Sequence, residues 1–299
     1  MSTPFEYVQE HPERTKSILG IDNNQLKELL AKAELLQIEY EKEVEAHKKY
    51  INKKGGGRKS ILSVEEEICL CIFYLKQFPT FEILGMNFGI SKSQANNIFH
   101  YWLKILEKLL PPSLMEQLKK KNIEDEDLAQ MFNESRLIVD SFEQPIERPG
   151  DYQTQKENYS GKKKMHTYKN QVIVLPSGED IIDIEIGNRG PKSDISIFRE
   201  QQKKFNENQM FDGDKAYIGG TNMKAPYKKP RNGELTVEQK EENKEFSSTR
   251  IFVEHVINVV KIFRIASLRW RLNRNSYERV ISVVCGLVRL RKETLEFNI

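Results

Sequence analysis

The chain is poor in the residues that make a protein disulfide-bonded or zinc-binding. Its 299 residues include only three cysteines, too few for a disulfide framework. No second Cys or His pair follows Cys69 and Cys71 at zinc-finger spacing. The helical pattern around these two cysteines also turns their thiols about 200° apart. We therefore expect Cys69, Cys71 and Cys285 to be small buried hydrophobic residues.

Long apolar segments are also missing. No run of about 18 apolar residues occurs, and the N-terminus lacks a signal-peptide pattern. The sequence therefore predicts no membrane partner and no export, and the expected location is the cytoplasm, at the nucleoid. The 38% hydrophobic content is enough for a modest core, and the length predicts about two domains.

A strong net charge is absent, because 47 basic residues nearly cancel 44 acidic ones. The distribution is uneven, since ten Lys or Arg stand against four Asp or Glu from residue 248 to the end. Such a surplus suits contact with nucleic-acid phosphates. In its densest part we expect Arg269 and Arg271 to contact phosphates, while Trp270 either stacks on the ligand or anchors the loop in the core.

Residues 1–56 predict a helical arm. Asp22 and Gln25 have the spacing of a capping box. Apolar residues and a histidine then recur on one side of a helix: Leu29, Ala33, Leu36, Tyr40, Val44 and His47. This seam fits either a dimerising coil or packing on the next domain of the same chain. Three glycines and four cations within residues 53–59 predict a flexible basic linker.

Residues 57–112 predict an all-helical helix-turn-helix domain. A capping box at Ser63 opens the first helix, residues 81–87 form the second, and Ser91 caps the third after a turn at Gly89. In such a unit the helix after the turn enters the major groove of DNA. A generic helical bundle shows the same pattern.

The third helix of this unit is amphipathic. Its buried side is expected to contain Ala95, Ile98, Trp102, Ile105 and Leu109. The first turn and the opposite side carry side chains of the types that contact phosphates and base edges. These candidate DNA-contacting residues are Lys92, Ser93, Gln94, Asn96 and Asn97.

Two later segments place an acid at the end of a β-rich run. A short apolar run ends in Asp140, and a second run breaks at glycine where Asp212 and Asp214 stand. An acid at each of two strand ends and a third acid on a late helix can converge on a divalent metal ion.

The third acid stands between two cations on a predicted helix. At about 100° per residue, Arg250 and Lys261 both lie within roughly 40° of Glu254. An apolar stripe roughly 140–200° from Glu254 is expected to be buried; it consists of Phe252, Val256, Val259 and Phe263. The pattern also fits a surface helix whose i, i+4 ion pair contributes only about 0.3–0.5 kcal/mol.

The order Asp140, Asp214, Glu254 and the local contexts of these acids resemble the DDE transposases of bacterial insertion sequences. The contexts are Val-Asp-Ser-Phe-Glu-Gln-Pro-Ile, Gly-Asp-Lys-Ala-Tyr-Ile-Gly and Ser-Ser-Thr-Arg-Ile-Phe-Val-Glu-His. The resemblance spans residues 58–292 and leaves the N-terminal arm unmatched.

The last acid of that superfamily lies in a Tyr-x2-Arg-x3-Glu-x6-Lys signature. Arg250, Glu254 and Lys261 match it in step, whereas Ser247 stands where some branches have the tyrosine. This chain therefore has no tyrosine at that position to carry out any role that depends on it.

The resemblance implies an α/β fold, in which a ribonuclease-H-like mixed-sheet catalytic domain follows the all-helical helix-turn-helix domain. The expected organisation is an arm and linker (1–56), the helix-turn-helix (57–112), an acidic linker (113–134) and the catalytic domain with its basic C-terminal helices (135–299). Within the catalytic domain we expect a strand at Asp140, a hairpin of 172–175 with 181–186, a helix from Asp194, a strand at Asp214 and the Glu254 helix.

The implied function is that of a transposase. It would bind double-stranded DNA, both transposon ends and target, as a homodimer or higher oligomer, with two Mg²⁺ or Mn²⁺ ions for cleavage and strand transfer. Asp140 is expected to bridge both ions, with Asp214 and Glu254 each holding one. Arg250 and Lys261 would contact phosphates. A ribonuclease-H-like endonuclease without strand transfer and a domesticated DNA-binding protein are the alternatives.

Other acids compete for these roles. Asp212 is the main rival to Asp214, because we expect both on the same side of one strand. Asp183 and Glu185 alternate with isoleucines and are expected to face solvent. Asp194 is expected to cap a helix.

A basic segment before the second strand is also similar to the family. Lys162, Lys163 and Lys164 are expected to hold the DNA end near the metal ions, with a solvated loop as the alternative. His166 is a possible site residue, although a structural hydrogen-bonding role fits it as well.

Overall fold

The computed structural model describes residues 2–47, 60–123, 132 and 135–297. The predicted basic linker at 53–59 and the acidic stretch at 124–127 lie outside these residues. The helices are α1 (Pro4–Glu10), α2 (Thr15–Leu19), α3 (Asn23–His47), α4 (Val64–Gln77), α5 (Phe81–Phe88), α6 (Lys92–Leu109), α7 (Leu114–Lys120), α9 (Tyr152–Asn158), α10 (Asp194–Gln201), α11 (Val237–Lys261) and α12 (Tyr277–Arg291). The strands are β1 (Leu137–Pro145), β2 (Tyr159–Ser160), β3 (Met165–Val174), β4 (Ile181–Arg189), β5 (Phe211–Asp212) and β6 (Met223–Lys224).

The strands form one mixed sheet. β1 pairs antiparallel with β3, β3 pairs antiparallel with β4, and β5 and β6 continue the sheet from β1 as parallel neighbours. β2 adds a short hairpin at the start of β3. Three antiparallel strands followed by parallel ones, with helices on both faces, confirm the expected ribonuclease-H-like fold.

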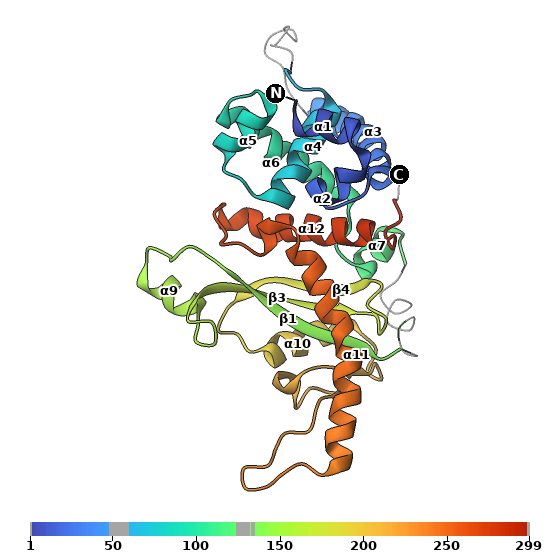
Figure 1. Ribbon diagram of the computed structural model, residues 1–299, viewed down its shortest axis with the longest axis vertical. Coiled ribbons are helices and arrows are strands. Elements are labelled where there is room, and N and C mark those ends of the chain that lie inside the picture. The colour runs from blue at the N-terminus through green and yellow to red at the C-terminus, as the bar shows by residue number, and fades with distance from the viewer. Residues whose placement is uncertain (1, 48–59, 124–131, 133–134, 298–299) are drawn as a thin grey trace.

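The two faces of the sheet pack into different cores because successive strand residues point to opposite sides. On β1, Ile138 and Phe142 belong to the large core that includes α11, α12 and the N-terminal helices. Leu137 and Val139 belong to a smaller core with Phe198 of α10. Asp140 lies between Ile138 and Phe142 in sequence, so it shares the face that α11 crosses (Figure 1).

Side-chain caps start the helices where the sequence predicts them. The side chains of Ser63, Ser91 and Asp22 each accept a hydrogen bond from the backbone N–H three residues on, and the side chain of that third residue accepts one from the backbone N–H of the cap. Gly89 ends α5 in the left-handed conformation, as its predicted turn requires. The three helices of the predicted helix-turn-helix are therefore α4, α5 and α6.

The N-terminal arm is part of the helical unit. α1 and α2 pack on α4, and α3 packs on α4 and α6. Within the seam of α3, Leu29 and Ala33 are buried in the shared core, and Tyr40 contacts the ring of Tyr101. The seam therefore packs on the chain's own helices. α1 was not predicted, although Thr3 and Glu6 form a capping box around Pro4.

α12 lies between the helical unit and the sheet (Figure 1). It packs on α6 on one side and on β4 on the other. The apolar stripe of this helix is buried throughout: Tyr277, Val280, Ile281, Val284 and Val288. The helix-turn-helix and the sheet consequently share one continuous hydrophobic core.

Three local predictions are wrong. β1 continues five residues beyond Asp140, so this acid lies within a strand and not at its end. β5 stops at Asp212, so Asp214 lies beyond the strand and caps a short 3₁₀ helix, Lys215–Tyr217. Asp194 is the first residue of α10, whose cap is Ser193.

Strand alternation predicted that Asp183 and Glu185 face solvent, and this prediction is wrong. Asp183 is 4% exposed and pairs with Lys204 at 2.9 Å, and Glu185 contacts the same lysine at 2.8 Å. The reason is that helices cover both faces of β4, so neither face of the strand leads directly to water.

The cysteines agree with the sequence: Cys69, Cys71 and Cys285 are free and buried. Burial raises the pKa of the Cys285 thiol to about 12. Within the described residues, none of the helices has both the length and the apolar character to cross a membrane.

Candidate active site

Asp140 lies close enough to both other predicted acids to interact with their charges, and α11 packs on β1 here. Asp140 is contributed by the strand, Asp214 by the turn after β5 and Glu254 by the helix. Burial raises the pKa of Asp140 to about 6, and the negative charges of Asp214 and Glu254 add to this rise. The hydrogen bond from Ser141 and the charge of Arg250 oppose it. Asp140 thus senses both other carboxylates.

Arg250 binds Asp140 directly. Its Nη2 lies 3.3 Å from Asp140 Oδ2, and the two side chains are 14% and 20% exposed. The Asp140 Oδ1 atom accepts the backbone N–H of Ser141 at 2.7 Å. Arg250 Nε is buried and has no hydrogen-bond partner in the structure. The guanidinium therefore neutralises the most buried acid of the site.

The buried face of α11 differs from the predicted one. It consists of Phe246, Val253, Val256, Ile257 and Val260, which centre roughly 100° to one side of Glu254 at about 100° per residue. Phe252, expected in the core, is 38% exposed. This rotation turns Arg250 toward the sheet and leaves Glu254 exposed at the edge of the packed face. Lys261 is exposed at the end of the same helix.

The turn that carries Asp214 depends on Gly213. A Cβ at this position would lie 2.9 Å from Met223 Sδ and 2.9 Å from Tyr217 Cδ2. Asp214 Oδ1 accepts the N–H of Ala216 at 2.7 Å, which fixes the carboxylate at the start of the 3₁₀ helix. The backbone therefore changes direction at Gly213, and this change separates Asp212 from Asp214.

Asp212, the rival acid, is engaged elsewhere. It is 7% exposed, and its Oδ1 atom accepts two hydrogen bonds from Arg136, at 2.7 and 3.1 Å. Arg136 directly precedes β1, and β1 runs parallel to β5. This neutralised pair favours Asp214 as the second acid of the site.

A second polar cluster lies on the opposite face of the sheet. Ser141 Oγ donates to Asp194 Oδ1 at 2.6 Å, and Lys169 Nζ lies 3.0 Å from the same oxygen. The sequence did not predict this cluster. Lys169 is a buried lysine of β3, and it is held by its pairing with Asp194 and by its hydrogen bond to the Lys192 carbonyl.

Three carboxylates of this kind fit a divalent cation, because carboxylate oxygens are the ligands that Mg²⁺ and Mn²⁺ prefer. As the side chains stand, no three Asp, Glu, His or Cys residues in the described part of the chain are grouped closely enough to hold an ion. Arg250 occupies Asp140 instead. The site has the donors for a metal ion, and the charge of Arg250 competes with such an ion for Asp140.

The predicted lysine loop lies far from the acids. Asp140 pairs with Val172 of β3, and β3 begins at Met165 after the loop. Seven residues of strand span roughly 23 Å, more than a lysine side chain can reach. Lys162, Lys163 and Lys164 are exposed and do not contact the acids, and their role in holding the DNA end stays a prediction.

His166 is also outside the site. It pairs with Tyr159 in the β2–β3 hairpin, and the two rings lie 5.5 Å apart. Six residues of strand, roughly 20 Å, separate it from Val172. This placement supports the structural alternative for His166.

The predicted phosphate contacts after α11 have different environments. Arg269 is exposed and lies 3.8 Å from Glu147. Arg271 stacks on the ring of Phe78 at 4.0 Å and donates to the Phe78 and Pro79 carbonyls at 2.6 and 3.1 Å. Trp270 is 3% exposed and contacts Tyr277, which confirms the anchoring alternative. Arg271 thus links this loop to the helix-turn-helix.

On α6 the candidate DNA-contacting side chains lie on the outer side, as predicted. Lys92, Ser93 and Asn97 are exposed, and Gln94 and Asn96 are half-buried. Gln94 Oε1 accepts the backbone N–H of Ser91 in the capping box, which fixes the orientation of its amide group. The buried side contains Ala95, Trp102, Ile105 and Leu109, with Ile98 half-buried.

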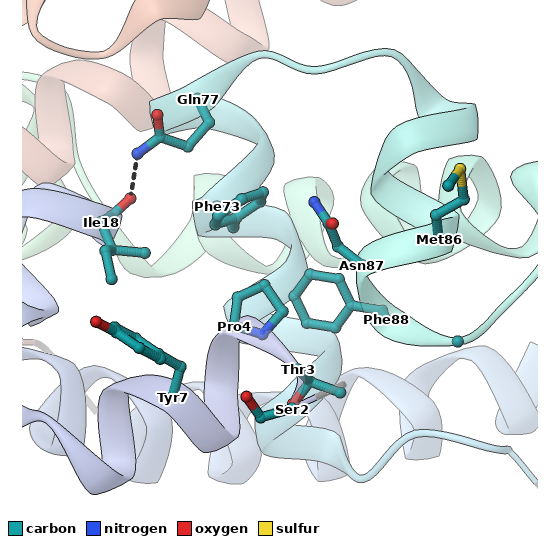
Figure 2. Close-up of a pocket in the computed structure, with 11 residues that line it drawn as sticks. Ser2, Thr3, Pro4, Tyr7, Ile18, Phe73, Gln77, Met86, Asn87 and Phe88 are labelled. Atoms are coloured by element: carbon teal, nitrogen blue, oxygen red, sulfur yellow. Dashed lines mark hydrogen bonds between the residues drawn. The ribbon is translucent and has the colours of Figure 1, made fainter.

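A hollow of about 760 Å³ lies beside this unit, between α1 and the turn after α5. Figure 2 shows its lining, where Gln77 donates to the Ile18 carbonyl at 2.8 Å. Phe73, Met86 and Phe88 supply apolar surface, and no acid, histidine or cysteine lines it. The hollow therefore offers no ligands of the kind found around Asp140.

Comparison with known proteins agrees with this arrangement. Residues 139–289 match the family described as DDE superfamily endonuclease, and residues 60–112 match the helix-turn-helix of DDE superfamily endonuclease. The probable transposase for insertion sequence element IS702 of Microchaete diplosiphon is 32% identical over 242 residues, 79% of this chain and 83% of the relative. A crystal structure of a pre-cleavage Mos1 transpososome aligns with 81% of this chain and 85% of its own at 10% identity, with a TM-score of 0.20, too low to support an argument.

Proposed function

Because the chain belongs to the DDE transposases of insertion sequences, with a helix-turn-helix before the catalytic domain, we propose that it binds the ends of its element and cleaves them with Asp140, Asp214 and Glu254. We further propose that the freed 3′-hydroxyl attacks target DNA and that a homodimer or higher oligomer brings two ends together. The observation that carries the proposal is that Asp140 lies close enough to Asp214 and Glu254 to interact with their charges.

The three acids would bind the metal ions that the reaction needs. Asp140, Asp214 and Glu254 would hold two Mg²⁺ or Mn²⁺ ions, with Asp140 shared by both. Divalent ions bound there would lower the pKa of the attacking water and stabilise the leaving 3′-oxygen. Hydrolysis breaks the P–O3′ bond and leaves a 3′-hydroxyl and a 5′-phosphate.

Cations on α11 would hold the DNA end. Arg250 and Lys261 lie within roughly 40° of Glu254 around the helix axis, on the helix that crosses the site. A guanidinium matches two phosphate oxygens with its planar fork, whereas an ammonium acts as a point charge. Once released from Asp140, Arg250 is suited to a phosphate close to the acids.

The helix-turn-helix would select the DNA. The exposed first turns of α6 carry Lys92, Ser93 and Asn97, and an asparagine amide can make two hydrogen bonds to an adenine edge. α12 packs on both α6 and β4. The recognition helix is therefore held in a fixed position relative to the acids.

The test uses the full-length chain and a duplex that carries the DNA flanking its reading frame. Asp140→Asn, Asp214→Asn and Glu254→Gln are each expected to reduce Mg²⁺- or Mn²⁺-dependent cleavage by more than about 100-fold, because each removes a metal ligand at nearly constant shape. DNA binding, measured by fluorescence anisotropy, should change little.

Two variants serve as controls. Glu245→Gln removes an exposed acid from α11 nine residues before Glu254, and Asp212→Asn keeps an oxygen for Arg136. Both should cleave as the unaltered chain does. If Asp212→Asn is inactive and Asp214→Asn active, the second acid is Asp212. If all three site variants cleave normally, the site lies elsewhere.

A further inference from the structure

A basic hollow of about 580 Å³ lies where β4 ends. Its lining includes three cations, Arg189, Lys192 and Arg274, and one acid, Glu157. All three cations are exposed. Arg189 is the last residue of β4, Lys192 lies in the loop before α10, and Arg274 begins the short 3₁₀ helix before α12. Residues more than eighty positions apart therefore place positive charge around one concavity.

The lining is held in place by the fold. The Arg274 guanidinium carbon lies 5.5 Å from the centre of the Tyr168 ring. Lys192 Nζ donates to Asn188 Oδ1 at 2.9 Å, and the buried Lys169 donates to the Lys192 carbonyl at 2.7 Å. Cations positioned in this way lose less side-chain freedom when they bind an anion.

Charge within the hollow is only partly balanced. Glu157 pairs with Arg189 at 3.0 Å, where the side chains are 26% and 52% exposed. Lys192 and Arg274 instead contact an amide oxygen and an aromatic face, neither of which neutralises them. The hollow therefore keeps a surplus of two positive charges, which suits a phosphodiester and disfavours an apolar ligand.

The Tyr168 ring beside Arg274 lies on the same face of the sheet as Asp140, whereas Asn188 and Lys192 approach the hollow from the face of Lys169, so the hollow lies at the end of β4 between the two faces. Gln144, four residues after Asp140 on β1, pairs with Tyr168, and Tyr168 pairs with Arg189. Paired residues point to the same face. Four residues along β1 and two strands across correspond to a backbone separation of roughly 16 Å. That distance is about five base-pair steps along a duplex.

We propose that this hollow binds the sugar–phosphate backbone of a DNA duplex about five base pairs from the phosphate held at Asp140, Asp214 and Glu254. The inference rests on the proposed function for the location of the reacting phosphate. Binding here depends on charge and spacing, so it is independent of base sequence.

The test is the salt dependence of DNA binding by the full-length chain. Arg274→Gln/Lys192→Gln removes the two cations that no acid neutralises, while Arg189 keeps Glu157. If each holds one phosphate, the slope of log K against log[salt] becomes shallower by about 1.8. Between 50 and 200 mM salt, the variant then loses about twelvefold less affinity than the unaltered chain.

Two matched variants distinguish charge at this place from charge in general. Arg274→Lys/Lys192→Arg keeps both charges and should retain the slope. Lys27→Gln/Lys42→Gln removes two exposed cations from α3 and should change it much less. Thermal unfolding of each variant shows whether the fold is intact.

Two probes identify the source of the DNA: a duplex with the sequence that flanks the reading frame, and an unrelated duplex of equal length. If Arg274→Gln/Lys192→Gln has a shallower slope on the flanking duplex alone, the hollow binds end DNA. If the slope is shallower on the unrelated duplex alone, the hollow binds target DNA. If it is shallower on both duplexes, the hollow binds DNA from either source. Unchanged slopes on both probes would overturn the inference. If the unaltered chain binds neither probe, the proposed function itself fails.

Discussion

The strongest test of how the two parts are joined is the replacement of Arg289 by methionine. Arg289 has no exposed surface, and its guanidinium binds both oxygens of Asp180 at 2.7 and 2.9 Å. It also donates to the carbonyls of Pro111 and Ser113, at 3.2 and 3.0 Å. One side chain of α12 thus fixes the β3–β4 turn and the segment after α6.

The expected magnitude follows from these contacts. Arg289→Met leaves Asp180, itself 4% exposed, as an uncompensated buried charge, which costs about 3–5 kcal/mol. A domain of ordinary stability unfolds with about 5–15 kcal/mol, so the variant loses a large part of its stability. Arg289→Met/Asp180→Asn removes the stranded charge and keeps an oxygen for the Ile181 N–H. The remaining cost of the double variant is that of the orphaned carbonyls, about 1–3 kcal/mol.

The assay is urea unfolding of the unaltered chain, of Arg289→Met and of Arg289→Met/Asp180→Asn, monitored by circular dichroism and by tryptophan fluorescence. The double variant should be more stable than Arg289→Met by at least about 1 kcal/mol, since buried unpaired charge is what destabilises the single variant. Equal stabilities of the single and double variants would refute this reasoning, as would a cost below about 1 kcal/mol for Arg289→Met.

Two further predictions concern the site and the recognition helix. Arg250→Gln should bind Mn²⁺ about tenfold more tightly in a calorimetric titration, because a charge-assisted hydrogen bond of about 1.5 kcal/mol no longer competes for Asp140. Lys261→Gln is the control, because Lys261 does not contact Asp140. Weaker Mn²⁺ binding by Arg250→Gln would contradict the proposed competition. Asn97→Ala should reduce the preference for the element's end over unrelated duplex by about 1–3 kcal/mol in competition binding, while nonspecific affinity changes little; equal loss on both duplexes would remove Asn97 from the base-reading residues.

Local sequence determined the helix-turn-helix almost completely. α4 and α6 start at capping boxes, α5 starts at the N-cap residue Thr80 and ends at Gly89, and these signals act within a few residues. The buried side of α6 followed from the helical period alone. The order and contexts of Asp140, Asp214 and Glu254 were likewise sufficient for the family, because such motifs are contiguous in the chain.

Tertiary packing decided where each acid lies and what it contacts. The period of α11 showed that Arg250 and Glu254 share a side, but only the sheet beneath the helix determines which neighbouring stripe is buried. Asp183 was misplaced for the same reason, since alternation along β4 cannot reveal that helices cover both faces. The separation of roughly 23 Å between Asp140 and the loop of Lys162 to Lys164 likewise follows only from the strand register.

Long-range charge pairing was equally beyond the sequence. Arg136 neutralises Asp212, and Arg250 binds Asp140 across 110 positions. Arg289 pairs with Asp180 only because α12 packs on β4. Local propensity acts over a few residues, whereas the partner of a buried charge is fixed by which segments fold together. The sequence by itself determined the helices of the helix-turn-helix, the family and the candidate acids; the tertiary structure decided which acid Arg250 binds, which arginine joins the two parts and where the basic hollow beside β4 forms.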